Sequence, residues 1–350
     1  MKRNVLFILI AACCLSACAH KHTSQSTEAT KRYFDAWVHV QKQDHPEYLW
    51  KQTALGSWIL EEKQGSGQAV GEFQDSLYLL VNYTNYDLDG TITATTSAIV
   101  SQQIGTYDET AYYGPGIWYA KGIYAGFEDV IKDMKPGGRR KFVMPGWLRT
   151  YDRYDSIDGY LNQEDDKMGA TAIFDIELRD YFPHIMDWAA DSVGRYLAAN
   201  YSARYGADPA AAAADTSGAY GFWYIQEKAP ADTVTLKDTT VYINYIGRLL
   251  NGRVFDTTIR DTAIVYGLDR DKDYAPVAIN YGTTWSDVTM GSDQSKVVPG
   301  FARTLFGRKS HEKGTGIFIF SLGYGHSGSG SKIPAYAPLR FDIELVDNPE

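Results

Sequence analysis

Cysteine is nearly absent from this chain of 350 residues, and the three that occur, Cys13, Cys14 and Cys18, all lie near its start. Cleavage of the chain before Cys18 would leave a single cysteine. An intramolecular disulfide and a thiol nucleophile are then both excluded, even in an oxidising compartment. We therefore expect the hydrophobic core alone to stabilise the fold, and the chain is long enough for two domains of common size.

Clusters of positive charge are also missing from the sequence. Lys and Arg number 34 against 43 Asp and Glu, which gives a net charge of -9. Surfaces that bind nucleic acid need concentrated Lys and Arg to neutralise phosphates, so we exclude nucleic acid as a partner. Aromatic residues are abundant instead, at 14% with 26 Tyr. This composition indicates a sheet-rich protein with grooves whose edges are exposed to water. Glycan-binding surfaces have a similar aromatic content.

The start of the chain has a short apolar run, Val5–Ile10, preceded by Lys2 and Arg3. Together with the small residues that precede Cys18, this pattern indicates a secretion signal rather than a membrane span. Residues 1–17 resemble bacterial lipoprotein signals, in which the cysteine is lipidated and becomes the first residue. The resemblance implies a lipid anchor at Cys18 in the cell envelope, at an outer membrane facing the periplasm. A plain signal peptide is the alternative.

Residues 18–55 are expected to form a tether and a short helical segment. The first part, 19–30, is polar and has no apolar periodicity. His20 and His22 are metal-ligand types, but no further ligand lies near them, so we predict neither a metal nor any other cofactor. Apolar residues then recur at roughly helical spacing between 30 and 54.

From residue 56 onward the chain repeats itself. The pentapeptide FDIEL at Phe174–Leu178 recurs unchanged at Phe341–Leu345, and GSWILEEKQ from Gly56 is matched by GFWYIQEKA from Gly221. Such repetition predicts two copies of one domain. The predicted boundaries are 56–183 for the first copy, 184–217 for a helix and linker, and 218–350 for the second copy.

Each copy is expected to combine one short helix with alternating strands. Apolar residues between Phe127 and Met134 lie at helical spacing and form one stripe, as do Phe301 and Leu305 in the second copy. Alternation of the kind seen from Leu339 to Leu345 is typical of antiparallel sheets with one buried face. The predicted fold class is α+β. Two inserts, 97–119 and 259–295, exceed ordinary loop lengths and are either lids or additional strands.

The stretch 241–258, VYINYIGRLLNGRVFDTT, combines a strand, a hairpin signal and a candidate site. Asn251-Gly252 is a strong two-residue hairpin signal. The first strand carries Tyr245, and the second opens with Phe255 and Asp256. Aromatic walls with one carboxylate suit a pocket that holds an apolar group and polarises one bond. An ordinary hairpin with core aromatics and a capping Asp is the alternative.

Further motifs follow in a fixed order: Val297-Val298-Pro299-Gly300-Phe301, then Tyr324-Gly325, Ile333-Pro334 and Leu339–Leu345. With the hairpin they resemble the FK506-binding-protein (FKBP) type of peptidyl-prolyl cis-trans isomerase over residues 218–350. The resemblance implies a curved antiparallel sheet wrapped around a short helix in each copy. It also implies isomerisation of Xaa-Pro bonds in unfolded or exported polypeptides, and binding of FK506-like macrolides.

The resemblance also assigns roles to individual residues of the second copy. Its catalytic positions are Tyr245, Phe255, Asp256 and Tyr324. Its substrate-binding positions are Val297, Val298, Phe301, Ile333 and Phe341. Two positions depart from the family pattern, because Phe301 stands where tryptophan is usual and Ser329 where histidine is frequent.

The first copy departs further from the family. Thr93 and Ala94 stand where the second copy has its phenylalanine and aspartate, and the flap from Tyr-Gly to Ile-Pro has no counterpart. We therefore expect the first copy to be non-catalytic. Two other functions stay open for the whole chain: a non-enzymatic chaperone or protein-binding lipoprotein with the same fold, and a carbohydrate-binding lipoprotein.

Overall fold

The computed structural model describes residues 25–164, 168–214, 219–231, 234, 236, 238–268 and 273–349. The expected signal at residues 1–17, Cys18, His20 and His22 lie outside the described residues. The described chain forms two compact units that are not contiguous in sequence. The C-terminal unit comprises Ser76–Asn82, Thr96–Trp118 and the chain from Tyr181 onward, and the remaining described residues form the N-terminal unit.

The first sheet has the strand order β1-β2-β6-β7-β3-β4, with β5 paired to β3. The pairs β1–β2, β2–β6, β6–β7 and β3–β4 are antiparallel. Its part of the chain contains α2 (Gln25–Asp44), β1 (Lys51–Gln52), β2 (Trp58–Lys63), β3 (Tyr78–Tyr86), β4 (Ile92–Thr95), α3 (Ala98–Gln103), β5 (Gly116–Tyr119), α4 (Ala125–Ile131), β6 (Arg139–Met144), α5 (Ile157–Leu161) and β7 (Ala172–Phe182).

The second sheet has the order β13-β12-β11-β9-β15-β14-β8, with β10 paired to β9, and these neighbouring strands are antiparallel. Its elements are α6 (Ile185–Tyr205), α7 (Pro209–Ala213), β8 (Phe222–Lys228), β9 (Thr239–Leu249), β10 (Val254–Thr257), α8 (Arg260–Val265), β11 (Val277–Tyr281), β12 (Thr289–Met290), β13 (Ser295–Lys296), α9 (Pro299–Leu305), β14 (Lys313–Phe318) and β15 (Leu339–Val346). Single 3-10 turns lie at Ala120–Gly122, Gly146–Leu148, Trp285–Asp287 and Phe320–Leu322.

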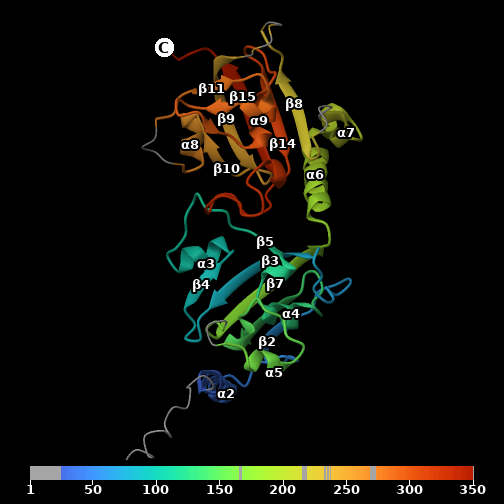
Figure 1. Cartoon of the computed structure of the whole chain (residues 1–350), viewed down its shortest axis with the longest axis vertical. Helices are drawn as coiled ribbons and strands as arrows, with labels where there is room; N and C mark the ends of the chain where they lie inside the picture. Colours follow the sequence, from blue (N-terminus) through green and yellow to red (C-terminus); the bar gives the residue numbers. More distant parts are fainter. Residues whose placement is uncertain are drawn as a thin grey trace, which may run out of the picture. The chain divides into compact units, whose positions relative to one another are not determined.

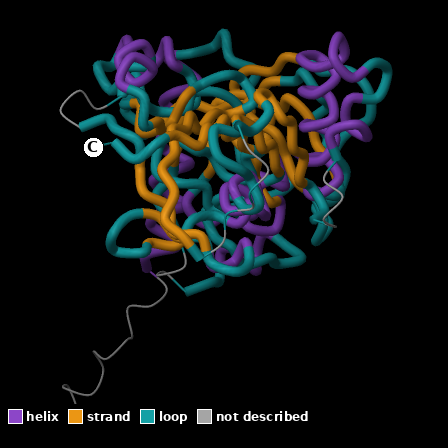
Figure 2. Tube along the Cα trace, turned by 90° about the horizontal axis from the view of Figure 1, so that it is seen from above, coloured by secondary structure: helices purple, strands orange, loops and turns teal. Residues whose placement is uncertain are grey.

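The two sheets share one topology, which confirms the predicted duplication and the α+β class. The order β2-β6-β7-β3-β4 in the first sheet corresponds to β8-β14-β15-β9-β10 in the second. The repeated FDIEL lies in the corresponding strands β7 and β15. Strands make up much of the trace, and most helices are short (Figure 2). The insert at 259–295 contributes α8 and the strands β11 and β12.

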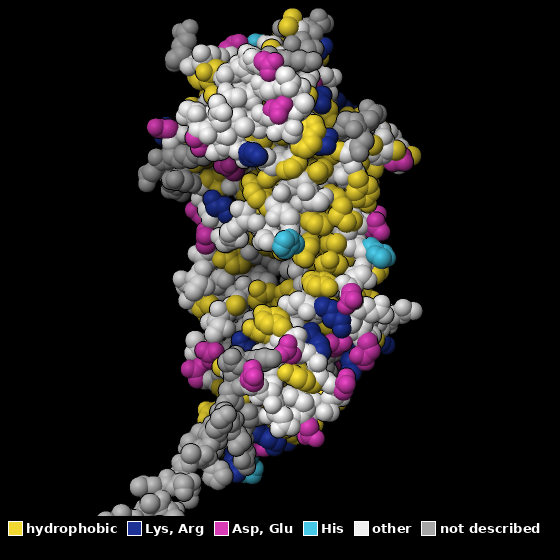
Figure 3. Space-filling model, in the orientation of Figure 1, with side chains coloured by type: hydrophobic (Ala, Val, Ile, Leu, Met, Phe, Trp, Pro, Cys, Tyr) yellow, Lys and Arg dark blue, Asp and Glu magenta, His cyan; other side chains and the backbone are white. Residues whose placement is uncertain are grey.

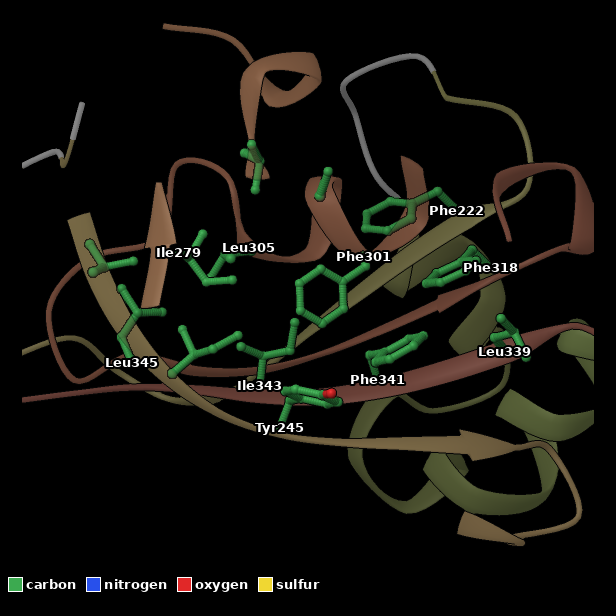
Figure 4. Close-up of a cluster of buried hydrophobic side chains, with 14 of the residues drawn as sticks. Phe222, Tyr245, Ile279, Phe301, Leu305, Phe318, Leu339, Phe341, Ile343 and Leu345 are labelled. Carbon is green, nitrogen blue, oxygen red and sulfur yellow. The ribbon is translucent and has the colours of Figure 1, made fainter. Parts of the chain in front are cut away.

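One face of the second sheet packs against α9 and forms the main core of the C-terminal unit. Phe301 and Leu305 of the helix are buried among side chains of β9 and β15, including Ile343 (Figure 4). Helix α9 has only seven residues. Helices this short are marginal in isolation, so the sheet must stabilise it.

The opposite face of this sheet is covered by α6, which runs alongside β8 and β14 (Figure 1). Val193 and Leu197 of the helix are fully buried and pack with Ile225 of β8 and Ile317 of β14. Hydrophobic side chains are visible along the α6 side of the C-terminal unit (Figure 3). The segment expected to be a helix and linker therefore begins with a helix that belongs to the C-terminal unit.

Candidate active site

The candidate site is built on the hairpin of β9 and β10. The amide of Leu249 donates to the carbonyl of Arg253 at 2.9 Å, which leaves three residues in the loop. Gly252 ends this loop with φ +89°, the left-handed conformation that three-residue hairpin loops require. The hairpin predicted at Asn251-Gly252 therefore has the predicted position, but its loop contains three residues and the prediction of two was wrong.

A β-bulge in β10 lets two consecutive side chains reach one site. The register of β9 and β10 shifts between Val254 and Asp256, which leaves Phe255 as the extra residue. In a regular strand, neighbouring side chains point to opposite faces, and a bulge re-aims one of them. The ring of Phe255 lies 5.5 Å from that of Phe341, while Asp256 accepts a hydrogen bond from Tyr245. The bulge thus joins an aromatic ring and a carboxylate in one cluster.

Gly247 on β9 leaves the space that this bulge occupies. A Cβ at Gly247 would lie 2.6 Å from the ring of Phe255 and 2.9 Å from the ring of Phe341. Both distances are shorter than van der Waals contact, so any larger residue would displace the rings. Sequence reasoning missed Gly247, although a glycine inside a strand often marks a close approach of this kind.

The rings of Tyr245, Phe301 and Phe341 lie at the centre of the site between α9 and the sheet (Figure 4). The rings of Tyr245 and Phe301 are 5.5 Å apart, those of Phe301 and Phe341 are 5.1 Å apart, and both pairs meet edge to face. Aromatic pairs prefer this geometry to a face-to-face sandwich. Pro299 at the first helical position starts α9 and thereby places Phe301 above the sheet.

The polar part of the site is a phenol paired with a carboxylate. The hydroxyl of Tyr245 donates to Oδ2 of Asp256 at 2.6 Å, and the amide of Thr257 donates to Oδ1 at 2.9 Å. Burial and the charge of Asp256 raise the pKa of Tyr245 far above its usual value, so the phenol remains a donor. Burial and the same charge also raise the pKa of Tyr324, whose side chain is more exposed.

Two threonines that sequence reasoning did not single out hold β9 and β10 together. The hydroxyl of Thr257 donates to the carbonyl of Tyr245 at 2.8 Å, and the amide of Tyr245 donates to the hydroxyl of Thr258 at 2.9 Å. Both threonines are buried. The signal was present in the sequence as Thr-Thr directly after Asp256, and the pair fixes the backbone on which the site is built.

Residues 324–333, which we call the flap, form a compact loop beside the aromatic rings. The amides of Ser329 and Ile333 donate to each other's carbonyls at 2.8 and 3.2 Å, and the amide of Gly328 donates to the carbonyl of Tyr324 at 3.2 Å. Ile333 is buried in the same cluster as the aromatic rings. Ser329, at the position where the family often has histidine, is exposed.

The structure thus brings the sequence-predicted residues of the second copy together. Five belong to one buried cluster: Tyr245, Phe255, Phe301, Ile333 and Phe341. Val297 and Val298, just before α9, are half-buried and pack against that cluster. The carboxylate of Asp256 and the phenol of Tyr324 lie at its polar side. We call this set the aromatic site.

The chemistry open to the aromatic site is non-covalent. Apolar rings exclude water beside the hydrogen bond from Tyr245 to Asp256, and such surroundings favour a less polar form of a bound group over a more polar one. Among the described residues, no three His, Cys, Asp or Glu side chains gather as a metal site needs. In the part of the chain that the structure describes, no helix is long and apolar enough to cross a membrane.

The N-terminal unit has buried aromatic rings at the place of the aromatic site, but its described residues lack the carboxylate beside them. Phe127 of α4 and Phe174 of β7 are buried, with ring centroids 5.0 Å apart. On β4, Ala94 pairs with Asn85, and Thr93 is exposed. Thr93 and Ala94 therefore provide only a hydroxyl and a methyl group on β4. The corresponding strand of the C-terminal unit, β10, carries a phenylalanine and an aspartate.

Comparisons with known proteins agree with this geometry. A family model described as FKBP-type peptidyl-prolyl cis-trans isomerase matches residues 232–346. FK506-binding protein 2 of Candida glabrata is 30% identical over 127 residues, which are 35% of this chain and 76% of that protein. Peptidyl-prolyl cis-trans isomerase FKBP11 of Bos taurus is 34% identical over 116 residues, 33% of this chain and 45% of that protein.

FK506-binding protein 2 of Dictyostelium discoideum is 33% identical over 104 residues, 30% of this chain and 61% of that protein. The chain spans about half the length of the bovine relative. The solved structure of the three FKBP domains of wheat FKBP73 covers 83% of this chain and 92% of its own at 13% identity, with a TM-score of 0.29. FkpA from Escherichia coli covers 47% of this chain and 62% of its own at 23% identity, also with a TM-score of 0.29.

A half-buried antiparallel sheet around a short helix is the fold of an FKBP-like domain. The chain contains two domains of this α+β kind, and the second also carries the aromatic site. The chain belongs to the family of FKBP-type peptidyl-prolyl cis-trans isomerases.

Proposed function

We propose that the C-terminal unit catalyses cis-trans isomerisation of Xaa-Pro bonds in unfolded or exported polypeptides. The observation that carries the proposal is the hydrogen bond of 2.6 Å from Tyr245 to Asp256 at the side of a buried aromatic cluster. Family membership supports it, because the family model that matches residues 232–346 is described as FKBP-type peptidyl-prolyl cis-trans isomerase.

The physical basis is preferential binding of a twisted amide. Rotation about a peptide bond has a barrier of about 18 to 20 kcal/mol because the planar form is stabilised by resonance. The twisted carbonyl has lost resonance and is less polar, so apolar rings such as Phe255 and Phe341 disfavour it less than the planar form. Binding that is tighter in the transition state lowers the barrier without breaking any bond.

An isomerase assay on the full chain with a proline tetrapeptide tests this proposal. We expect Asp256→Ala to lower kcat/KM by about tenfold or more, since one lost contact of about 1.4 kcal/mol has that effect. Asp273→Ala, at an exposed position of the same unit, is the matched control. A well-folded chain without activity that still suppresses aggregation would instead support the alternative of a non-enzymatic chaperone.

We propose further that the N-terminal unit is non-catalytic and captures unfolded chain for the C-terminal unit. A second weak site on the same chain raises the local concentration of a long substrate without new contacts. Deleting residues 56–183 is unsuitable as a test, because residues 96–118 belong to the C-terminal unit. Tyr83 is a half-buried residue of the N-terminal unit on β3, the strand that corresponds to β9. Tyr83→Ala should slow catalysed refolding of a proline-limited protein and leave tetrapeptide turnover unchanged. Tyr33→Ala, at an exposed position on α2, is the control.

We also propose that the mature protein is anchored in the cell envelope through a lipidated Cys18, at an outer membrane facing the periplasm. The support is the sequence pattern before this cysteine. Mass spectrometry of the mature N-terminus decides the point, and an unmodified end beyond Cys18 excludes the anchor. Binding of FK506-like macrolides at the aromatic site is expected to inhibit turnover in competition with the peptide.

A further inference from the structure

The segment Thr96–Trp118 interrupts the first copy in sequence, yet it belongs to the C-terminal unit. It is fixed there at two points. The amide of Tyr112 donates to the carbonyl of Ser331 in the flap at 2.7 Å, and the guanidinium of Arg253 donates to the carbonyl of Glu109. The side chain of Tyr112 also packs against the hydrophobic core that contains the aromatic rings. The segment therefore rests on the flap and on the β9–β10 hairpin, the two elements that build the aromatic site.

The segment has internal order of its own, so it can present a defined surface. The rings of Tyr107 and Tyr113 stack at 5.3 Å, and the amide of Asp108 donates to the hydroxyl of Tyr113 at 2.9 Å. The hydroxyl of Tyr112 donates to the carbonyl of Pro115 at 3.1 Å. Contacts of this kind pre-organise a loop and reduce the entropic cost of binding to it.

A cavity of about 220 Å³ lies between this segment, the hairpin, α6 and the turn that follows the flap. Its lining includes Tyr112, Pro115, Trp188, Leu250, Pro334 and Tyr336. None of the described residues that line it is charged. A cavity of about 150 Å³ with apolar walls is large enough to hold benzene, so this one has room for a large apolar side chain.

The wall formed by Tyr336 is held in an unusual conformation. Its φ is +60°, in the left-handed region that bulky residues rarely adopt. The amide of Tyr336 donates to the carbonyl of Gly325 at 3.0 Å, and its ring meets that of Phe320 edge to face at 5.2 Å. Such strain persists only where the surroundings determine it, and it is concentrated at functional sites.

The cavity and the aromatic site share one continuous stretch of chain. Ile333 is part of the aromatic cluster, and the next residue, Pro334, lines the cavity. Residues 333 and 336 are at most about 11 Å apart, a distance that three or four residues of an extended polypeptide span. The cavity is therefore within a few residues' reach of a polypeptide whose proline occupies the aromatic site.

We propose that this cavity is a second binding site for the substrate polypeptide and takes one large apolar side chain, three or four positions from the Xaa-Pro bond. This inference rests on the proposed isomerase function of the C-terminal unit. The substrate class it defines is an unfolded chain with an aromatic or long aliphatic residue near its proline. The 96–118 segment provides one wall of the site, which links an insert of the first copy to substrate selection by the second.

The test compares two peptides with the full chain as enzyme. One peptide has Trp or Phe three or four positions from its proline, on either side, and the other has Ser there. We expect the aromatic peptide to have a KM about tenfold lower at similar kcat, the low end of the discrimination that one apolar pocket provides. Equal KM values with normal turnover would overturn this inference and leave the proposed function intact.

Variants that occupy the cavity supply the second readout. Ala335 lines the cavity and is half-exposed, so Ala335→Trp should fill it and reduce the ratio of the two KM values to within about twofold. Leu250→Lys, at a half-exposed loop position, introduces a charge there and should act in the same way. Ala229→Trp, at an exposed position after β8, is the matched control and should retain the full ratio. If Ala335→Trp and Leu250→Lys leave the ratio of the two KM values unchanged, the cavity is not the cause of the difference between the peptides.

A binding measurement separates failure of this inference from failure of the proposed function. A proline-free peptide with the same aromatic residue should bind to the full chain in calorimetry and bind about tenfold more weakly to the Ala335→Trp variant. If the chain shows this binding but no isomerisation, the cavity site stands and the isomerase proposal fails. If the peptide binds both chains equally, or neither, the cavity site is wrong.

Discussion

Tyr245→Phe removes one atom from the centre of the site. The phenol of Tyr245 is buried and donates to the carboxylate of Asp256 at 2.6 Å. A hydrogen bond to a charged group contributes about 1.5 to 3 kcal/mol, so we expect the free energy of unfolding to fall by about that much. For a unit of this size, 2 kcal/mol corresponds to a decrease in Tm of about 4 to 8 °C. Calorimetry of the full chain measures this decrease.

The same core offers a matched control. Tyr281 is also buried, and its hydroxyl donates to the carbonyl of Leu305, a neutral acceptor. Tyr281→Phe should cost about 0.5 to 1.5 kcal/mol and leave kcat/KM unchanged, because this bond lies outside the aromatic site. Tyr245→Phe should lower kcat/KM as well as Tm, because Asp256 loses the donor that orients it.

A double-mutant cycle measures the interaction energy between Tyr245 and Asp256. If the phenol acts through the carboxylate, Tyr245→Phe and Asp256→Ala together should cost less than the sum of their separate effects on kcat/KM. The expected interaction energy is about 1 to 3 kcal/mol. Additivity within about 0.5 kcal/mol would refute the reasoning, because the two residues would then act independently.

Three further predictions follow from the packing and the buried charge. Gly247→Ala should lower the free energy of unfolding by about 1 to 3 kcal/mol through overpacking and should also reduce isomerase activity. Gly252→Ala, in open space at φ +89°, should lower stability alone. Denaturation and activity measured on both variants distinguish the two outcomes. Phe301→Ala should cost about 3 to 5 kcal/mol in denaturant unfolding, and a value under 1 kcal/mol would contradict its burial. Burial raises the pKa of Asp129 above its ordinary value of 3.8, so the native state binds the proton more tightly than the unfolded state. Its contribution to stability therefore falls as pH rises above that value, and Asp129→Asn should remove this part of the pH dependence of Tm.

Much of the fold was predictable from local patterns. Alternation along β15 and the helical stripe of α4 reflect which face of each element is buried, and the recurrence of FDIEL reflects the duplication. The hairpin at Asn251-Gly252 was predictable because few residues tolerate φ above zero. Its loop length was not, since a two-residue and a three-residue loop share the same signal and differ in the register of the strands.

The composition of the aromatic site was also predictable, because its residues lie in ordered motifs. The means by which they meet was not. The bulge at Phe255, the space at Gly247 and the bonds from Thr257 and Thr258 depend on a partner strand. A sequence shows which residues are aromatic or acidic, whereas a bulge becomes visible only in the pairing of two strands.

Local patterns in the sequence were enough to assign the class of the protein: two α+β copies, of which the first lacks the phenylalanine and aspartate of the second. Periodicity, turn residues and motif order are local properties, and each is written in consecutive residues. The folded chain was needed to show that residues 96–118 belong to the C-terminal unit and that α6 covers the outer face of its sheet. The physical reason is that both depend on contacts between residues far apart in sequence, such as Tyr112 with Ser331. Long-range contacts of this kind depend on the shapes of folded surfaces, which no local pattern encodes.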